Sequence, residues 1–190
     1  MLLGRTSELK YLNNYYDREG SQILVVYGQK HIGKTALVRE FIEDKPHCYY
    51  LAGACSEREQ TYQWGRQLVQ EGYELEPFPT FHDIFAKISR QSKGKKVLVI
   101  DEFPYMCRGN PGIPSILQNL WDGVLKDSNA MIILCGSAMS FIEKEVLAEK
   151  NPLYGRATGI YKMNEMGFYD AAKFFPDYSD RDKVLAYAVL

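Results

Sequence analysis

Residues 28–35, with the sequence GQKHIGKT, constrain the fold more than any other part of the chain. They match the pattern GxxxxGK[ST], which a chain of this composition contains by chance in roughly 0.7% of cases. The apolar run 22–27 precedes this segment and an amphipathic segment follows it, as expected for a phosphate-binding loop between a buried strand and a helix. The sequence therefore predicts a parallel sheet with a phosphate site at one edge.

The residue types of this loop explain how it would bind ATP. Glycines at 28 and 33 let the backbone curl until its amides face the phosphates, and the start of the next helix adds positive potential. The Lys34 ammonium is expected to reach the β- and γ-phosphates, and the Thr35 hydroxyl to bind Mg²⁺. The residues expected to bind this cofactor are Gly28, Gln29, Lys30, His31, Ile32, Gly33, Lys34, Thr35 and Ala36.

Strands and helices are predicted to alternate along the chain. Apolar runs rich in β-formers predict strands at 22–27, 47–52, 95–101, 130–136 and 159–163. Helical periodicity predicts helices at 7–16, 35–44, 60–71, 81–91, 113–125, 140–150 and 168–175. This alternation predicts an α/β fold whose parallel sheet is covered by helices on both faces.

Two carboxylates, Asp101 and Glu102, end the predicted strand 95–101. Ligands of open α/β sheets bind at this carboxyl edge. We expect Asp101 to hold Mg²⁺ together with Thr35, and Glu102 to act as the general base that activates water. The alternative is an acidic pair that merely ends a strand, but the neighbouring phosphate loop favours the catalytic interpretation.

Two further residues are candidates for contact with the γ-phosphate. Ser137 directly follows the predicted strand 130–136, although a simple Gly-Ser turn would give the same sequence. Arg156 follows a glycine in the segment 151–156 and fits the role of an arginine finger, with a structural or solvated arginine as the alternative. With Glu102, these residues complete the predicted catalytic set.

The composition excludes several classes of protein. The chain has 23 Lys and Arg against 24 Asp and Glu, and its apolar runs are far shorter than the roughly 20 residues of a membrane span. No signal peptide and no zinc-ligand spacing of the four cysteines is recognisable, so a cytoplasmic protein without membrane contacts is expected. A basic cluster leaves nucleic-acid contact open, with a solvated helix end as the favoured alternative: Lys87, Arg90, Lys93, Lys95 and Lys96.

Several motifs together resemble the prokaryotic archaeal-type ATPase family, in the STAND branch of the AAA+ P-loop proteins. The resemblance is carried by 3–5 with Glu8, 28–35, 97–105, 135–137, 152–156 and 187–190. It implies a three-layer P-loop NTPase fold with strand order 5-1-4-3-2. It also implies that ATP lies between the sheet and a helical lid, with Arg5 near the base, and that Arg156 acts in cis or, through self-association, on a neighbouring protomer.

The same resemblance divides the chain into an NTPase core, 1–165, and the beginning of a helical lid, 166–190. Such proteins usually continue into a further lid helix, a winged-helix domain and often a nuclease-like domain, so the lid is expected to be truncated here. DNA contacts would then lie in parts outside this chain.

The expected function is Mg²⁺-dependent binding and hydrolysis of ATP by a regulatory switch. One alternative is an interaction module that binds ATP or ADP without hydrolysing it. Another is the ATPase motor of a DNA-acting protein, because the Asp-Glu pair also occurs in such motors.

Overall fold

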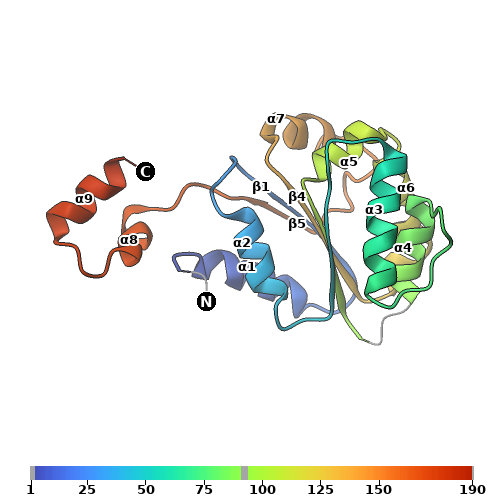
Figure 1. The fold of residues 1–190 in the computed structure, drawn as a ribbon, viewed down its shortest axis with the longest axis horizontal. Helices are drawn as coiled ribbons and strands as arrows, with labels where there is room; N and C mark the ends of the chain where they lie inside the picture. The colour runs from blue at the N-terminus through green and yellow to red at the C-terminus, as the bar shows by residue number, and fades with distance from the viewer. Residues whose placement is uncertain (1–2, 91–93, 190) are drawn as a thin grey trace.

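Five parallel strands form the centre of the molecule in the computed structural model, which describes residues 3–90 and 94–189 (Figure 1). The order in the sheet is β2-β3-β4-β1-β5, which is the predicted order 5-1-4-3-2 read from the other edge. The strands are β1 (Gln22–Tyr27), β2 (His47–Leu51), β3 (Lys96–Asp101), β4 (Ala130–Gly136) and β5 (Gly159–Lys162). The predicted fold class and strand order are therefore confirmed.

Helices cover both faces of this sheet and complete three layers (Figure 1). One face carries α1 (Thr6–Tyr16) and α2 (Lys34–Ile42). The opposite face carries α3 (Glu57–Gln70), α4 (Phe81–Arg90), α5 (Phe103–Gly109) and α6 (Ile113–Gly123). Helix α7 (Met139–Phe141) follows β4, and α8 (Phe168–Ala171) and α9 (Asp180–Ala188) follow β5.

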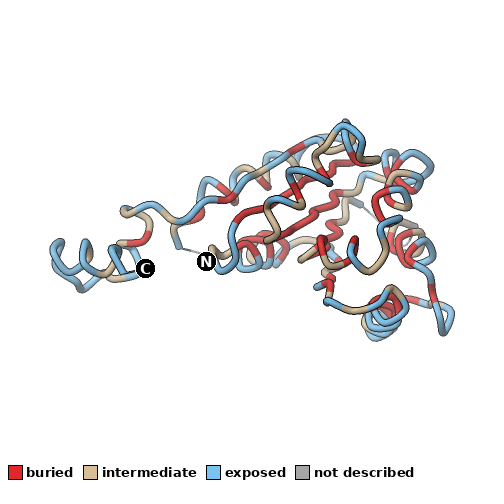
Figure 2. Tube along the Cα trace, turned by 90° about the horizontal axis from the view of Figure 1, so that it is seen from above, coloured by how far each residue is buried: buried red, intermediate tan, exposed pale blue. Residues whose placement is uncertain are grey.

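The two faces of β1 show why its sequence is apolar from Ile23 to Val26. All six residues of this strand are buried, as the red sheet interior in Figure 2 illustrates. Ile23 and Val25 pack on the side of α3 to α6, whereas Leu24 and Val26 pack on the side of α1 and α2. A strand buried on both faces favours apolar side chains, with Gln22 at its start as the exception, and the motif that follows the strand is anchored in the core.

Trp64 of α3 fills the larger of the two cores. Its ring is fully buried, stacks on Tyr50 at a centroid distance of 4.5 Å and meets Phe85 edge-on at 5.3 Å. We expect Trp64→Ala to lower the free energy of unfolding by about 3–5 kcal/mol, because the lost contacts leave a large cavity. Denaturant unfolding measures this loss, and Tyr62→Ala on the exposed side of the same helix is the control. A loss below about 1 kcal/mol would contradict this account of the core.

Three local predictions differ from the structure. The predicted helix 140–150 is wrong: α7 is a single turn that continues as a π-helix, Ile142–Val146, whose two end residues are both buried. The helix 168–175 is instead α8 followed by the 3₁₀ turn Ala172–Phe174. Helix α5 was not predicted, because its second residue is Pro104; proline is tolerated in a first helical turn.

Helices α8 and α9 extend away from the sheet (Figures 1 and 2). Helix α9 begins at a cap in which the Ser179 hydroxyl accepts a hydrogen bond from the Asp182 amide. None of its described residues is buried. Val184 and Leu185 are 54% and 56% exposed. Within the described ranges, no helix is both long and apolar enough to cross a membrane.

Candidate functional site at the carboxyl edge of the sheet

The loop between β1 and α2 has a shape that two glycines make possible. Gly33 caps α2 with φ of 93°, a left-handed conformation that favours glycine. A Cβ at Gly28 would lie 2.3 Å from the Met163 carbonyl oxygen, so no larger residue fits there. The first amides of α2 have no partner inside the helix and remain available to an anion.

The side chains in the middle of the loop are turned outward. Gln29, Lys30 and His31 are exposed, Ile32 is half-buried, and Ala36 is exposed on α2. These positions can therefore contribute backbone amides to a ligand while their side chains remain in solvent.

Lys34 lies beneath the loop and is only 5% exposed. Its Nζ donates hydrogen bonds to the carbonyls of Gly28 at 2.9 Å and Gln29 at 2.5 Å. Burial lowers the pKa of this ammonium group, while the nearby carboxylates of Glu102 and Asp101 oppose that shift. Within the part of the chain that the structure describes, Lys34 forms no ion pair, so a buried cation here has the electrostatic capacity to hold a phosphate.

Asp101 and Thr35 meet directly beside this lysine. The Thr35 hydroxyl donates to Oδ2 of the buried Asp101 at 2.7 Å, and the Glu102 amide donates to Oδ1 at 3.0 Å. A hydroxyl and a carboxylate are hard oxygen donors of the kind that Mg²⁺ prefers. The donor set fits this ion, which Thr35 and Asp101 would hold.

Tyr49 of β2 is a third contact of Asp101 that the sequence reasoning missed. Its hydroxyl donates to Asp101 Oδ2 at 2.7 Å. Burial and this hydrogen bond raise the pKa of Tyr49, so the hydroxyl stays protonated and can donate at neutral pH. The residue lies in a strand that reads as ordinary core, and only the adjacency of β2 and β3 brings it to the site.

Glu102 stands at the start of α5 in a left-handed conformation, with φ of 54°. Such a backbone is unfavourable for a non-glycine residue and is found where surrounding structure enforces it. Its Oε2 accepts hydrogen bonds from the Ser137 hydroxyl at 2.9 Å and the Ser137 amide at 3.4 Å. The structure therefore brings Ser137 together with Glu102, at the ends of two neighbouring strands.

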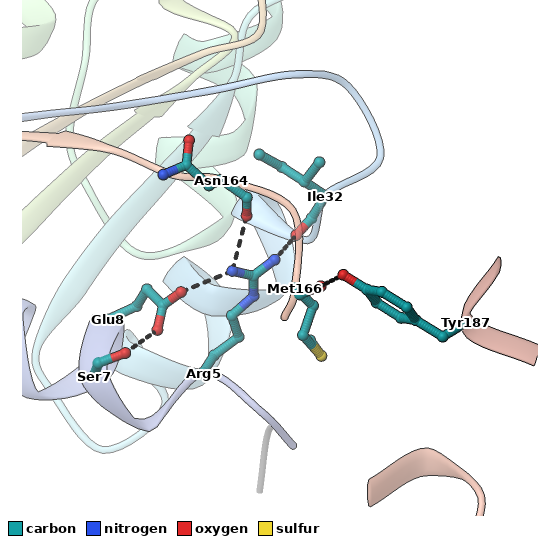
Figure 3. A network of polar contacts seen from close by, with 7 residues as sticks. All are labelled: Arg5, Ser7, Glu8, Ile32, Asn164, Met166 and Tyr187. Atoms are coloured by element: carbon teal, nitrogen blue, oxygen red, sulfur yellow. Dashed lines mark hydrogen bonds and ion pairs between the residues drawn. The ribbon is translucent and has the colours of Figure 1, made fainter. Parts of the chain in front are cut away.

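Arg5 connects the chain's first helix to the back of the phosphate loop (Figure 3). Its guanidinium donates to the Ile32 carbonyl at 2.8 Å, the Asn164 carbonyl at 3.0 Å and the Glu8 carboxylate at 2.7 Å. Burial alone would raise the pKa of Glu8, but hydrogen bonds from Ser7 and Arg5 lower it, so Glu8 is a carboxylate at neutral pH. Arg5 thus fixes the loop at Ile32, whereas Lys34 binds it at Gly28 and Gln29.

A cleft of about 610 Å³ opens between the phosphate loop and the segment that follows β5. Arg5, His31 and Gly33 line one side, and the other side is largely apolar, with contributions from Met166, Ala171, Phe174, Phe175 and Tyr187. The Tyr187 hydroxyl donates to the Met166 carbonyl at 3.2 Å, which joins α9 to this wall (Figure 3).

Arg156 lies elsewhere. It precedes β5 at the amino edge of the sheet, whereas the phosphate loop leaves the carboxyl end of β1. Its guanidinium binds Asp122 at 2.6 Å and 3.1 Å and the Pro152 carbonyl at 2.8 Å. Within one chain, this arrangement separates Arg156 from the other candidate residues.

The basic cluster is also partly engaged within the fold. Lys95 Nζ donates to the carbonyls of Arg18 and Gly20, and Lys96 lies 4.6 Å from the centre of the Tyr73 ring. Lys93 lies outside the described residues. Lys95 and Lys96, at the start of β3, therefore contact their own chain.

Comparison with known proteins agrees with this geometry. The uncharacterized protein MJECL04 of Methanocaldococcus jannaschii is 32% identical over 93% of this chain, and the match spans 38% of that relative's length. The Walker-type ATPase PABY2304 of Pyrococcus abyssi has a similar fold, with a TM-score of 0.69 at 19% identity, covering 100% of this chain and 63% of that one. The ORC2 protein of Aeropyrum pernix, solved in ADPNP-ADP complexes, matches with a TM-score of 0.68 at 16% identity over 92% and 51%.

The family comparison covers nearly the whole sequence. The family described as the ATPase domain predominantly from Archaea matches residues 2–187. This range contains the phosphate loop, the Asp101–Glu102 pair and the wall of the cleft after β5. The chain therefore belongs to this family of archaeal-type ATPase domains.

Proposed function

We propose that this chain binds and hydrolyses ATP with Mg²⁺ as the nucleotide switch of an AAA+/STAND-type protein. The observation that carries the proposal is the buried Lys34 ammonium, held by loop carbonyls and without a direct ion pair among the described residues, beside the Thr35–Asp101 pair. An anion bound to Mg²⁺ supplies the charge that this site requires. A nucleotide triphosphate is such an anion.

The residues divide the work of hydrolysis in this proposal. Lys34 and the loop amides hold the β- and γ-phosphates, while Thr35 and Asp101 hold Mg²⁺, which neutralises phosphate charge. Glu102 accepts a proton from the attacking water, and Ser137 holds the Glu102 carboxylate through its hydroxyl. A water molecule aligned with the γ-phosphate would then transfer its proton to the Glu102 carboxylate.

The cleft after β5 is the proposed place of the nucleotide base. Its apolar wall suits a flat ring, and it adjoins the loop at His31 to Gly33, where the phosphates would begin. Closure of α8 and α9 over a bound nucleotide would connect the state of the phosphate site to the part of the chain that follows β5. This coupling would make the domain a switch.

Steady phosphate release from ATP tests the proposal. The chain should release phosphate with MgCl₂ and should stop when EDTA removes the metal, because charge neutralisation at the phosphates is lost. Nucleotide binding without any phosphate release would contradict hydrolysis and support the interaction module that binds without turnover.

Arg156 enters the proposal through a second copy of the chain. At the amino edge of the sheet it is free to approach a neighbour's γ-phosphate once its contacts with Asp122 are exchanged. Arg156→Ala is expected to reduce turnover by about 10³-fold, the lower end for an arginine finger. Phosphate release measures this, with Arg66→Ala on the exposed side of α3 as control.

Mixing two inactive variants separates action in trans from a structural role. Arg156→Ala has an intact Glu102, and Glu102→Gln has an intact Arg156, so a mixed assembly contains complete sites between unlike copies. The mixture should recover activity that rises with protein concentration. Activity no greater than the sum of the two separate variants would contradict the assignment of Arg156.

A further inference from the structure

The Asp101 carboxylate accepts three described hydrogen bonds, of which one comes from Thr35, the other proposed metal ligand. Its Oδ2 atom accepts two hydrogen bonds of 2.7 Å, one from Thr35 Oγ1 and one from Tyr49 Oη. Its Oδ1 atom accepts the Glu102 amide at 3.0 Å. The orientation of this carboxylate therefore depends on Tyr49, a residue in a different strand from Asp101.

The sheet places the Tyr49 hydroxyl next to the Asp101 carboxylate. Tyr49 pairs with Val99 in the register of β2 and β3, so it shares a face with Asp101, two residues further along β3. Helix α2 covers this face of the sheet. Tyr49 packs against the apolar core between the helix and the sheet.

Two contacts from neighbouring helices fix the position of the tyrosine. The Arg39 guanidinium of α2 lies 4.5 Å from the centre of the Tyr49 ring, within the range of a cation–π interaction. The Gln67 side chain of α3 donates to the Tyr49 carbonyl at 2.7 Å. The hydroxyl thus reaches Asp101 from a ring whose freedom to rotate is restricted.

We infer that Tyr49 is a positioning residue that orients the Asp101 carboxylate for the divalent cation of the nucleotide. This inference rests on the proposed function of the site. A carboxylate that has lost one of its three described hydrogen bonds is less firmly oriented, and the entropy of fixing it again opposes metal binding. Loss of such an outer partner typically lowers metal affinity by about 10–100-fold.

Tyr49→Phe tests the inference without changing the shape of the ring. The dissociation constant of ADP is measured by calorimetry for each protein, once with MgCl₂ and once with EDTA. In the variant, ADP affinity with MgCl₂ should fall about tenfold. With EDTA it should stay within about twofold of the wild-type value, since Asp101 then holds no metal. The unchanged EDTA value also establishes that the variant folds and keeps its loop.

Tyr50→Phe is the matched control. Tyr50 is the next residue of the same strand, but it faces the opposite core, where its hydroxyl donates to the Gln60 carbonyl at 3.2 Å. This variant loses one buried hydroxyl, as Tyr49→Phe does, yet should retain the full effect of Mg²⁺ on ADP affinity.

The remaining outcomes each overturn a defined statement. A Tyr49→Phe variant with the wild-type effect of Mg²⁺ overturns the positioning role alone, as does an equal loss of affinity with and without the metal. Wild-type protein that binds ADP but ignores Mg²⁺ overturns both the inference and the metal in the proposed function. Wild-type protein that binds no nucleotide overturns the proposed function as a whole.

Discussion

Glu102→Gln is expected to reduce ATP turnover by about 10²–10⁴-fold, the usual contribution of a general base. The amide has the shape of the carboxylate, and its oxygen can still accept a hydrogen bond from the Ser137 hydroxyl. It cannot, however, take a proton from water. ATP affinity should stay within about twofold, because Lys34, Thr35 and Asp101 are unchanged. Phosphate release and calorimetric binding measure the two quantities separately.

A second carboxylate, outside the site, controls for the change of charge. Glu43→Gln alters an exposed residue at the end of α2 and should leave turnover and binding unchanged. Wild-type turnover in Glu102→Gln would show that another group activates water, and would remove Glu102 from the mechanism.

Lys34→Ala is expected to weaken ATP binding by about 10–100-fold, the equivalent of roughly 1.5–3 kcal/mol for a hydrogen bond to a charged group. The substitution removes the buried ammonium group that would bind the phosphates, and it also removes two hydrogen bonds that shape the loop. Calorimetric titration with Mg·ATP measures the loss.

Lys30→Ala is the matched control for this prediction. Lys30 lies in the same loop, but its side chain is exposed and its backbone amide is kept in the variant. We expect its ATP affinity to change by less than about threefold, as for a solvent-screened charge. Equal affinities of Lys34→Ala and wild-type protein would contradict the phosphate-binding role of the loop.

The centre of the fold and of the site was predictable because its signals are local. The glycines, Lys34 and Thr35 lie in one continuous segment, and the strand before it is largely apolar. Asp101 and Glu102 likewise follow directly from a buried strand, and parallel strands end at one edge. The strand order came from the family resemblance, not from the periodicity of the sequence.

Interactions between distant segments were not predictable in the same way. Tyr49 reaches Asp101 only because β2 and β3 are neighbours in register, and nothing in the sequence near Tyr49 marks it. Arg156 illustrates the opposite case, because its glycine-containing segment suggested a catalytic role, while the start of β5 places it at the amino edge of the sheet. In both cases the tertiary arrangement decides what a side chain can contact.

The prediction of a helix at 140–150, after β4, was wrong for a different reason. Residues 140–150 have helical spacing, but a π-helical turn brings both Ile142 and Val146 into the core and the regular helix ends there. Packing against the sheet overrides the helix propensity of such a short segment. The sequence contains no capping residue that would predict where the regular helix ends.

Calorimetric titration of the wild-type chain with ATP, in MgCl₂ and in EDTA, tests the central claim most directly. The buried Lys34 beside the Thr35–Asp101 pair predicts saturable binding of one ATP per chain that Mg²⁺ strengthens and ADP competes away. A folded chain that takes up no ATP at millimolar concentration in either medium would contradict the assignment of this edge of the sheet as a nucleotide site.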